Sequence, residues 1–279
     1  MLTLIKKITK NLWSQKSLPT EPTEIPRNLL LDKCLSDLVK SLANDSYSDL
    51  DEVERSKKVA SDIALDVKNK GYLLIPSVLP MELIKNLRLE FDHIISNANQ
   101  LPYKVDSHNG SICVRVRPRW SLLSQGYPIT SAIFDCELFR QISEAFYCVG
   151  EEQLTFNSEI FVHETPVTTQ PLSKSLHWDR SQTLKFWIYV DDVPLEAGPM
   201  RVVPGSAKSN RARKSTLSKK NTGLKGGVDN LADESGADTE HLTGASGTIL
   251  IHDTDCSHGA TNVSSGYVRR IMRGHTRLA

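Results

Sequence analysis

The sequence predicts a mainly β fold, a barrel or sandwich that follows a helical N-terminal part. Three observations carry this prediction. From about residue 111 apolar side chains alternate with polar ones, which is typical of strands with one buried face. These strand-like runs are short and are separated by Gly-Pro and Pro-Gly turns, without the regular intervening helices that a parallel sheet needs. Before residue 111 the apolar residues follow the spacing of amphipathic helices.

The first 27 residues are expected to form an arm ahead of a single domain over residues 28–279. Residues 1–13 mix lysines with leucines and isoleucines, which is consistent with a plain terminal helix or with one that touches a membrane surface. Residues 14–27 are rich in Pro, Ser and Thr and are interpreted as a linker. No apolar run reaches the roughly 20 residues that a membrane-spanning helix needs.

Helical spacing then recurs in several segments of the chain. Gly71 is expected to end the second helix, and Pro80 to lie near the start of the third. The helices are expected at about residues 29–39, 53–67, 80–97 and 131–148.

The expected strands are the runs GYLLIPSVL, ICVRVRPRW, LTFNSEIFVHE, LKFWIYVDDV, MRVVPGS, GTILIHD and VRRIMRGHTRL. One polar interruption, about residues 207–243, begins basic and ends acidic. It is interpreted as a structureless loop, either a solvated insertion or a lid whose basic half meets a phosphate or carboxylate of the substrate.

Charge and cysteine content exclude some classes of protein. The 34 Lys plus Arg residues nearly balance the 33 Asp plus Glu residues, so nothing indicates nucleic-acid binding. The 5 cysteines are scattered and form no CxxC pair, which favours a reduced cytoplasmic protein over a disulfide or zinc-finger scaffold.

The most informative motif is His177-Trp178-Asp179, with a second histidine, His258, far downstream. On a strand, His177 and Asp179 leave the same face, because alternate side chains point the same way. Two imidazoles and one carboxylate leave half of an octahedral coordination sphere open, as in the facial triad of non-heme Fe(II) oxygenases. A zinc ion on three such ligands would instead indicate a hydrolase.

An arginine favours the iron oxygenase. Arg269 follows His258 by eleven positions, and its guanidinium is suited to the distal carboxylate of 2-oxoglutarate. Arg270 points to the opposite strand face, and the alternation alone does not choose between the two. The predicted cofactors are therefore Fe(II), 2-oxoglutarate and O₂.

Other histidines and arginines receive weaker interpretations. His252 is a rival ligand, but six residues of extended chain would place it about 20 Å from His258, so a packing role is favoured. His163, His241 and His275 are given no role in the site. The alternating arginines of the ICVRVRPRW run share one strand face, which is either solvated or meets an anionic substrate: Arg115, Arg117 and Arg119.

Two stretches, LHWDRSQTLKFWIYVDDVPLEAGPMRVVPGSAKS and GTILIHDTDCSHGATNVSSGYVRRIM, resemble the phytanoyl-CoA dioxygenase family of 2-oxoglutarate oxygenases. The likeness includes GYLLIPSVLPMELIKNLRLEF and so spans roughly residues 68–279. It implies a double-stranded β-helix, also called a jelly roll or cupin-like fold, with N-terminal helices packed outside.

The resemblance also implies roles for particular residues. The metal ligands of the family match His177, Asp179 and His258, and its co-substrate arginine matches Arg269. Trp187 falls where the family often has an aromatic residue lining the co-substrate pocket.

Further expectations concern the wall of the pocket and the reaction. Phe186 and Ile188 are expected to complete a dry wall beside Trp187. Related halogenases lack the metal carboxylate, so Asp179 favours hydroxylation. Ala207 stands where the family often has a histidine after its PGS turn, which leaves the substrate open.

We therefore predict a dioxygenase that hydroxylates an unactivated C–H bond of a small molecule and releases succinate and CO₂. Anionic small molecules are among the substrates considered. Lipid or acyl, saccharide and natural-product substrates all stay open. One alternative is a cupin-like metal protein with a non-oxygenase activity, which would tolerate Arg269→Ala. Another is an inactive binding scaffold, which would bind Fe(II) without forming succinate.

Overall fold

The computed structural model describes residues 27–43, 47–98, 104–108, 111–116, 126–157, 159–167, 176–219, 228–231 and 238–279. Apart from Arg27, the expected arm lies outside these residues, and so do the terminal helix, the linker and the membrane contact predicted for it.

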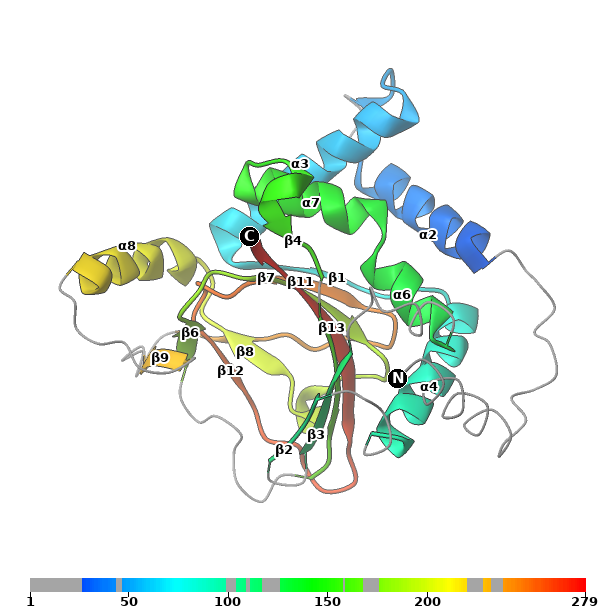
Figure 1. Cartoon of the computed structure of the whole chain (residues 1–279), viewed down its shortest axis with the longest axis vertical. Helices are drawn as coiled ribbons and strands as arrows, with labels where there is room; N and C mark the ends of the chain where they lie inside the picture. Colours follow the sequence, from blue (N-terminus) through cyan, green and yellow to red (C-terminus); the bar gives the residue numbers. More distant parts are fainter. Residues whose placement is uncertain are drawn as a thin grey trace, which may run out of the picture.

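The predicted N-terminal and central helices are confirmed, and they lie together on one side of the β-structure (Figure 1). Helix α3 begins after Asp51, whose side chain accepts from the Glu54 amide, and ends at Gly71 with φ 95°. Within the described ranges, no helix is long and apolar enough to cross a membrane. These helices are α2 (Arg27–Leu42), α3 (Glu52–Lys70), α4 (Met81–Ser96), α6 (Pro128–Phe134) and α7 (Glu137–Tyr147), with short 3₁₀ turns η2 (Glu151–Gln153) and η3 (Leu195–Ala197).

The strands form two antiparallel sheets, which confirms the mainly β prediction. The larger sheet has the order β1-β11-β7-β13-β5-β3-β2, with β4 on β13. Its strands are β1 (Tyr72–Ile75), β2 (Lys104–His108), β3 (Ser111–Val116), β4 (Leu154–Thr155), β5 (Ile160–Thr165), β7 (Leu184–Tyr189), β11 (Ile249–Asp253) and β13 (Arg269–Leu278).

The smaller sheet has the order β10-β8-β12-β6-β9. From β5 to β8, and again from β11 to β13, successive strands alternate between the two sheets, which winds the chain as a double-stranded β-helix. The strands of the smaller sheet are β6 (His177–Asp179), β8 (Met200–Val202), β9 (Val228–Leu231), β10 (Glu240–His241) and β12 (His258–Ala260).

Strand β7 separates two cores. Phe186 and Ile188 belong to the core shared with the helices, and Phe186 stacks on Phe139 of α7 with ring centroids 4.3 Å apart. Trp187 and Tyr189 lie on the other face, against the interior between the sheets. The prediction that Phe186 and Ile188 line the pocket beside Trp187 is therefore wrong, because adjacent strand residues point to opposite faces.

Residues 206–219 also depart from the expectation. They form helix α8 (Ser206–Lys219), although a structureless loop was expected from residue 207. Most residues of α8 are polar or charged, so the segment lacks the apolar stripe by which amphipathic helices are found in a sequence. Polar side chains attach its inner side to the barrel: Asn210 donates to the Asp255 carbonyl at 2.9 Å, and Arg211 pairs with Asp253 at 2.6 Å.

Candidate metal centre

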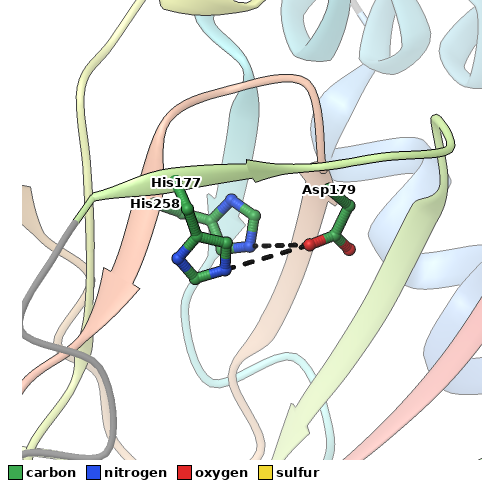
Figure 2. Close-up of side chains that lie close together, drawn as sticks. All are labelled: His177, Asp179 and His258. Carbon is green, nitrogen blue, oxygen red and sulfur yellow. Dashed lines mark ion pairs between the residues drawn. The ribbon is translucent and has the colours of Figure 1, made fainter. Parts of the chain in front are cut away.

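Two short strands of the smaller sheet bring the triad together. His258 on β12 lies directly opposite His177 on β6, and Asp179 follows on the same face of β6. The backbone amide of Asp179 donates to the Thr254 carbonyl at 3.0 Å, which fixes β6 to the turn that precedes β12. Figure 2 shows both imidazoles pointing toward the Asp179 carboxylate.

The ligand atoms surround one point. The Nε2 atoms of His258 and His177 lie 3.6 Å and 3.9 Å from the same oxygen, Oδ1 of Asp179. All three potential ligand atoms lie within 4.8 Å of one another. These contacts are too long for hydrogen bonds. Metal–ligand bonds of about 2.1 Å place neighbouring ligands roughly 3 Å apart, so small side-chain rotations suffice to close the triad on one ion.

The protonation state of His258 is the one that a metal ligand needs. Burial and the nearby Lys185 charge lower the pKa of His258 to about 3, so its imidazole is neutral at physiological pH. Its Nδ1 lies 2.8 Å from the Cys256 carbonyl, and a proton on Nδ1 donated to that oxygen leaves the Nε2 lone pair facing the triad.

Lys185 orients the carboxylate. Its Nζ donates to Oδ2 of Asp179 at 2.7 Å, which leaves Oδ1 beside the two histidines. Burial tends to raise the pKa of Asp179, but the charges and the hydrogen bond of its neighbours, above all Lys185, outweigh burial and lower it. The sequence prediction did not include Lys185. A lysine inside the apolar run LKFWIYV, at the same strand parity as Trp187, was the available signal.

His252 packs against the triad, which agrees with the packing role favoured from the sequence. The large separation from His258 that an extended chain implied was wrong. Its imidazole is fully buried and meets the His258 ring edge to face, with centroids 4.5 Å apart. The turn between β11 and β12 reverses the chain, so the five intervening residues do not extend. Among the described residues, neither ring nitrogen of His252 has a hydrogen-bond partner. Burial lowers the pKa of His252 well below its usual value.

The two arginines that the sequence could not separate face opposite ways. Arg269 is 9% exposed, and its guanidinium donates to the Gly198 carbonyl and, at 3.4 Å, to Oγ1 of Thr165. Burial lowers the pKa of Arg269 to about 10. Arg270 lies on the outer face over the Phe91 ring, with centroid 4.5 Å away. Arg270 is paired there with Asp92, Asp191 and Glu164.

The remaining candidates are distributed as follows. Arg115 lies over the Phe161 ring, and Arg117 and Arg119 lie outside the described residues. His163 and His275 are on the inner face of the larger sheet, whereas His241 is exposed.

Two basic residues of the insertion form ion pairs with carboxylates of the protein. Arg211 pairs with Asp253, and Lys214 pairs with Asp255, which is 1% exposed. In these two residues the positive charge is matched by protein carboxylates and is not left for a substrate anion. For the other basic residues of the insertion the lid interpretation stays a prediction.

The comparisons with known proteins agree with this geometry. The sequence matches the model of the phytanoyl-CoA dioxygenase family over residues 67–271, and the chain belongs to that family. Among curated protein sequences, none matches the chain.

Solved structures confirm the predicted double-stranded β-helix. The epimerase SnoN, in complex with Fe3+, alpha ketoglutarate and nogalamycin RO, is 16% identical with a TM-score of 0.57, over 80% of this chain and 84% of its own. The carbocyclase SnoK from nogalamycin biosynthesis is 17% identical with a TM-score of 0.51, over 77% and 82%. EctD from S. alaskensis, with 2-oxoglutarate and 5-hydroxyectoine, is 11% identical with a TM-score of 0.52, over 77% and 74%.

Proposed function

We propose that this chain is an Fe(II)- and 2-oxoglutarate-dependent dioxygenase that hydroxylates a C–H bond of a small molecule. The observation that carries the proposal is the convergence of two imidazoles on Oδ1 of Asp179. Membership of the phytanoyl-CoA dioxygenase family supports it. A carboxylate and two neutral imidazoles form the donor set of the facial triad, which leaves positions open for a co-substrate.

In this proposal His177, Asp179 and His258 hold the iron. When bound, Fe(II) with 2-oxoglutarate and O₂ supplies the oxidising power, with succinate and CO₂ as co-products. Lys185 keeps Oδ1 of Asp179 directed at the metal position by holding Oδ2. The triad side chains are only 9% to 21% exposed, so the protein excludes most water from the reaction.

Arg269 and Trp187 are proposed to hold the co-substrate. Arg269 is buried on the inner face of β13 and presents a planar fork suited to the distal carboxylate of 2-oxoglutarate. Trp187 lies on the inner face of the neighbouring strand β7. None of the 5 cysteines, all of which lie in the described ranges, forms a disulfide, which supports the expected cytoplasmic location.

Hydroxylation is a narrower proposal than 2-oxoglutarate-dependent catalysis in general. The structurally similar proteins include an epimerase and a carbocyclase. The proposed triad includes the carboxylate of Asp179, and this supports hydroxylation over halogenation.

An anaerobic titration tests the proposal. Protein is loaded with Fe(II) and 2-oxoglutarate, the visible charge-transfer band is recorded, and succinate is measured after O₂ is admitted. We expect both signals, and we expect His177→Ala to abolish both. His241→Ala, at an exposed histidine of β10, serves as the matched control and should retain them.

Three outcomes would reject the proposal. Absence of both signals in the unaltered protein argues against any 2-oxoglutarate chemistry. Fe(II) binding without succinate, with or without candidate substrates, favours a binding scaffold. Full activity of Arg269→Ala favours a cupin-like enzyme that does not use 2-oxoglutarate.

A further inference from the structure

A row of alternating cations and rings crosses the inner face of the larger sheet. The strand register places Arg115 of β3 opposite Phe161 of β5, Phe161 opposite Arg273 of β13, and Arg273 opposite Trp187 of β7. The side chains touch along this row. The guanidinium carbon of Arg273 lies 4.9 Å from the Phe161 centroid and 5.1 Å from the Trp187 ring, and that of Arg115 lies 5.2 Å from Phe161.

Arg273 differs from Arg269 and Arg270 of the same strand. Arg270 is paired with three carboxylates, and Arg269 donates to a carbonyl and a hydroxyl. Among the described residues, Arg273 makes ring contacts but no hydrogen bond or ion pair. In the same part of the chain its Nε is shielded from solvent without a hydrogen-bond partner, as are the Nε atoms of Arg269 and Arg270. Arg273 is half-buried, and a half-buried guanidinium whose donors have no protein partner favours an anion.

Within the described ranges, no carboxylate pairs with Arg273. Burial lowers the pKa of Arg273, and the Cys113 and Asp179 groups oppose this effect. Lys185, which holds Asp179, is two residues from Trp187 on the inner face of β7. Trp187 lies opposite Arg273, so Arg273 is close to the triad. Both oxygens of Asp179 are engaged, however, with Oδ1 beside the two histidines and Oδ2 on Lys185.

The two rings determine how a ligand can approach. Trp187 and Phe161 lie on the two strands that flank β13, so they occupy the two sides of the Arg273 guanidinium. Its edge is then left for hydrogen bonds, and that edge matches the two oxygens of a carboxylate or phosphate. Arg269 is four residues away on the same face, about 13 Å along an extended strand, so the two cations form separate anchors.

We propose that Arg273 binds an anionic group, a carboxylate or a phosphate, on the substrate that is oxidised. This proposal rests on the proposed dioxygenase function, in which Arg269 takes the 2-oxoglutarate. It assigns the substrate to the acidic small molecules and places the acidic group beside Trp187 and Phe161, near the Lys185 that holds Asp179.

Small anions test the site directly. Protein loaded with Fe(II) and 2-oxoglutarate, without O₂, is titrated by calorimetry with inorganic phosphate and separately with acetate. Neutral acetamide is the comparison ligand. We expect phosphate or acetate to bind more tightly than acetamide, and the tighter of the two anions indicates the substrate's acidic group. Arg273→Gln should weaken anion binding about tenfold, and Arg273→Lys should weaken it less because it keeps the charge.

Matched variants and a second readout guard against misinterpretation. Arg277→Gln alters an exposed arginine four residues further along β13 and should leave anion binding unchanged. Circular dichroism and the melting temperature establish that each variant is folded. Equal anion affinity in Arg273→Gln and the unaltered protein would overturn the proposal, as would binding of both phosphate and acetate no tighter than that of acetamide.

The two proposals fail in different ways. If Arg273→Gln weakens 2-oxoglutarate about tenfold, Arg273 belongs to the co-substrate site and the substrate anchor is refuted, while the dioxygenase stands. If no succinate forms but anion binding still depends on Arg273, the dioxygenase is refuted and the anion site stands.

Discussion

Neighbouring arginines of β13 have different environments because a strand alternates its faces. Arg269 is directed inward and reaches the Gly198 carbonyl, whereas Arg270 is directed outward into the carboxylates of Asp92 and Asp191. The sequence shows two adjacent arginines at nearly the same offset from His258. Only the position of the second sheet and of the helices decides which of them faces the site.

This difference gives a matched pair of variants. We expect Arg269→Lys to weaken 2-oxoglutarate binding about tenfold, because one ammonium cannot replace two parallel hydrogen bonds to a carboxylate. Arg270→Lys should leave 2-oxoglutarate affinity unchanged. Anaerobic titration of the Fe(II)-loaded variants measures both affinities. If 2-oxoglutarate affinity fell in Arg270→Lys but not in Arg269→Lys, the co-substrate would bind at the outer face of β13 and the role proposed for Arg269 would be wrong.

The ligands of the candidate site were predictable, but their partners were not. His177 and Asp179 are two residues apart, and His258 was predicted from the strand before it, from the offset of Arg269 and from the family resemblance. Lys185 and His252 reach the triad from the opposite sheet. Such contacts depend on how two sheets face each other, which is a long-range property. The error at Phe186 and Ile188 was avoidable, because strand alternation alone excludes them.

At the scale of elements, helix α8 supports the turn that carries His258. Asn210 is fully buried and donates to the Asp255 carbonyl and to Oγ of Ser257, at 2.9 Å and 2.8 Å. Ser206 accepts from the Ser257 amide at 2.8 Å. The helix was not predicted because these contacts are polar and specific, and they leave no periodic apolar pattern in the sequence.

Two neighbouring residues test whether α8 positions the metal ligand. Asn210→Ala removes two hydrogen bonds to the turn, so we expect the free energy of unfolding to fall by about 1–3 kcal/mol. Fe(II) affinity should fall as well, because the turn before His258 is less well held. Ser209→Ala is the control, since Ser209 is exposed and its side chain donates to the Ser206 carbonyl of the same helix.

Chemical denaturation and anaerobic Fe(II) titration of both variants supply the measurements. A lower stability of Asn210→Ala with unchanged Fe(II) affinity would show that α8 only stabilises the fold. Equal effects of the two substitutions would show that the contacts to the turn are not responsible.

At the scale of the whole molecule, the sequence predicted the types of elements better than their arrangement. Period-two runs located most of the strands, and Gly71 and Pro80 marked helix boundaries. The order β1-β11-β7-β13-β5 pairs strands that are far apart in the chain, and a single sequence carries no local signal for such pairing. The same arrangement concentrates basic groups between the sheets, where Lys185, Arg269 and Arg273 all point inward.

This basic interior has a consequence for acid stability. His163 and His275 lie on the inner face, and the Nε2 of each is shielded without a hydrogen-bond partner among the described residues. Burial, followed by the Arg273 charge, lowers the pKa of both imidazoles well below the usual value of 6.5. Below about pH 6.5 the unfolded chain therefore takes up protons at these positions while the folded chain does not.

The contribution of the two neutral imidazoles to the free energy of unfolding is therefore fully present above pH 6.5 and decreases as the pH falls below that value. Each histidine contributes a slope of roughly 1 kcal/mol per pH unit in that range. Urea denaturation of the metal-free protein between pH 7.5 and pH 5 measures this slope. The double variant His163→Gln/His275→Gln should have a shallower slope than the unaltered protein, and His241→Gln should not. An unchanged slope in the double variant would mean that the two imidazoles already titrate normally inside the barrel, and that the interior is more hydrated than its burial implies.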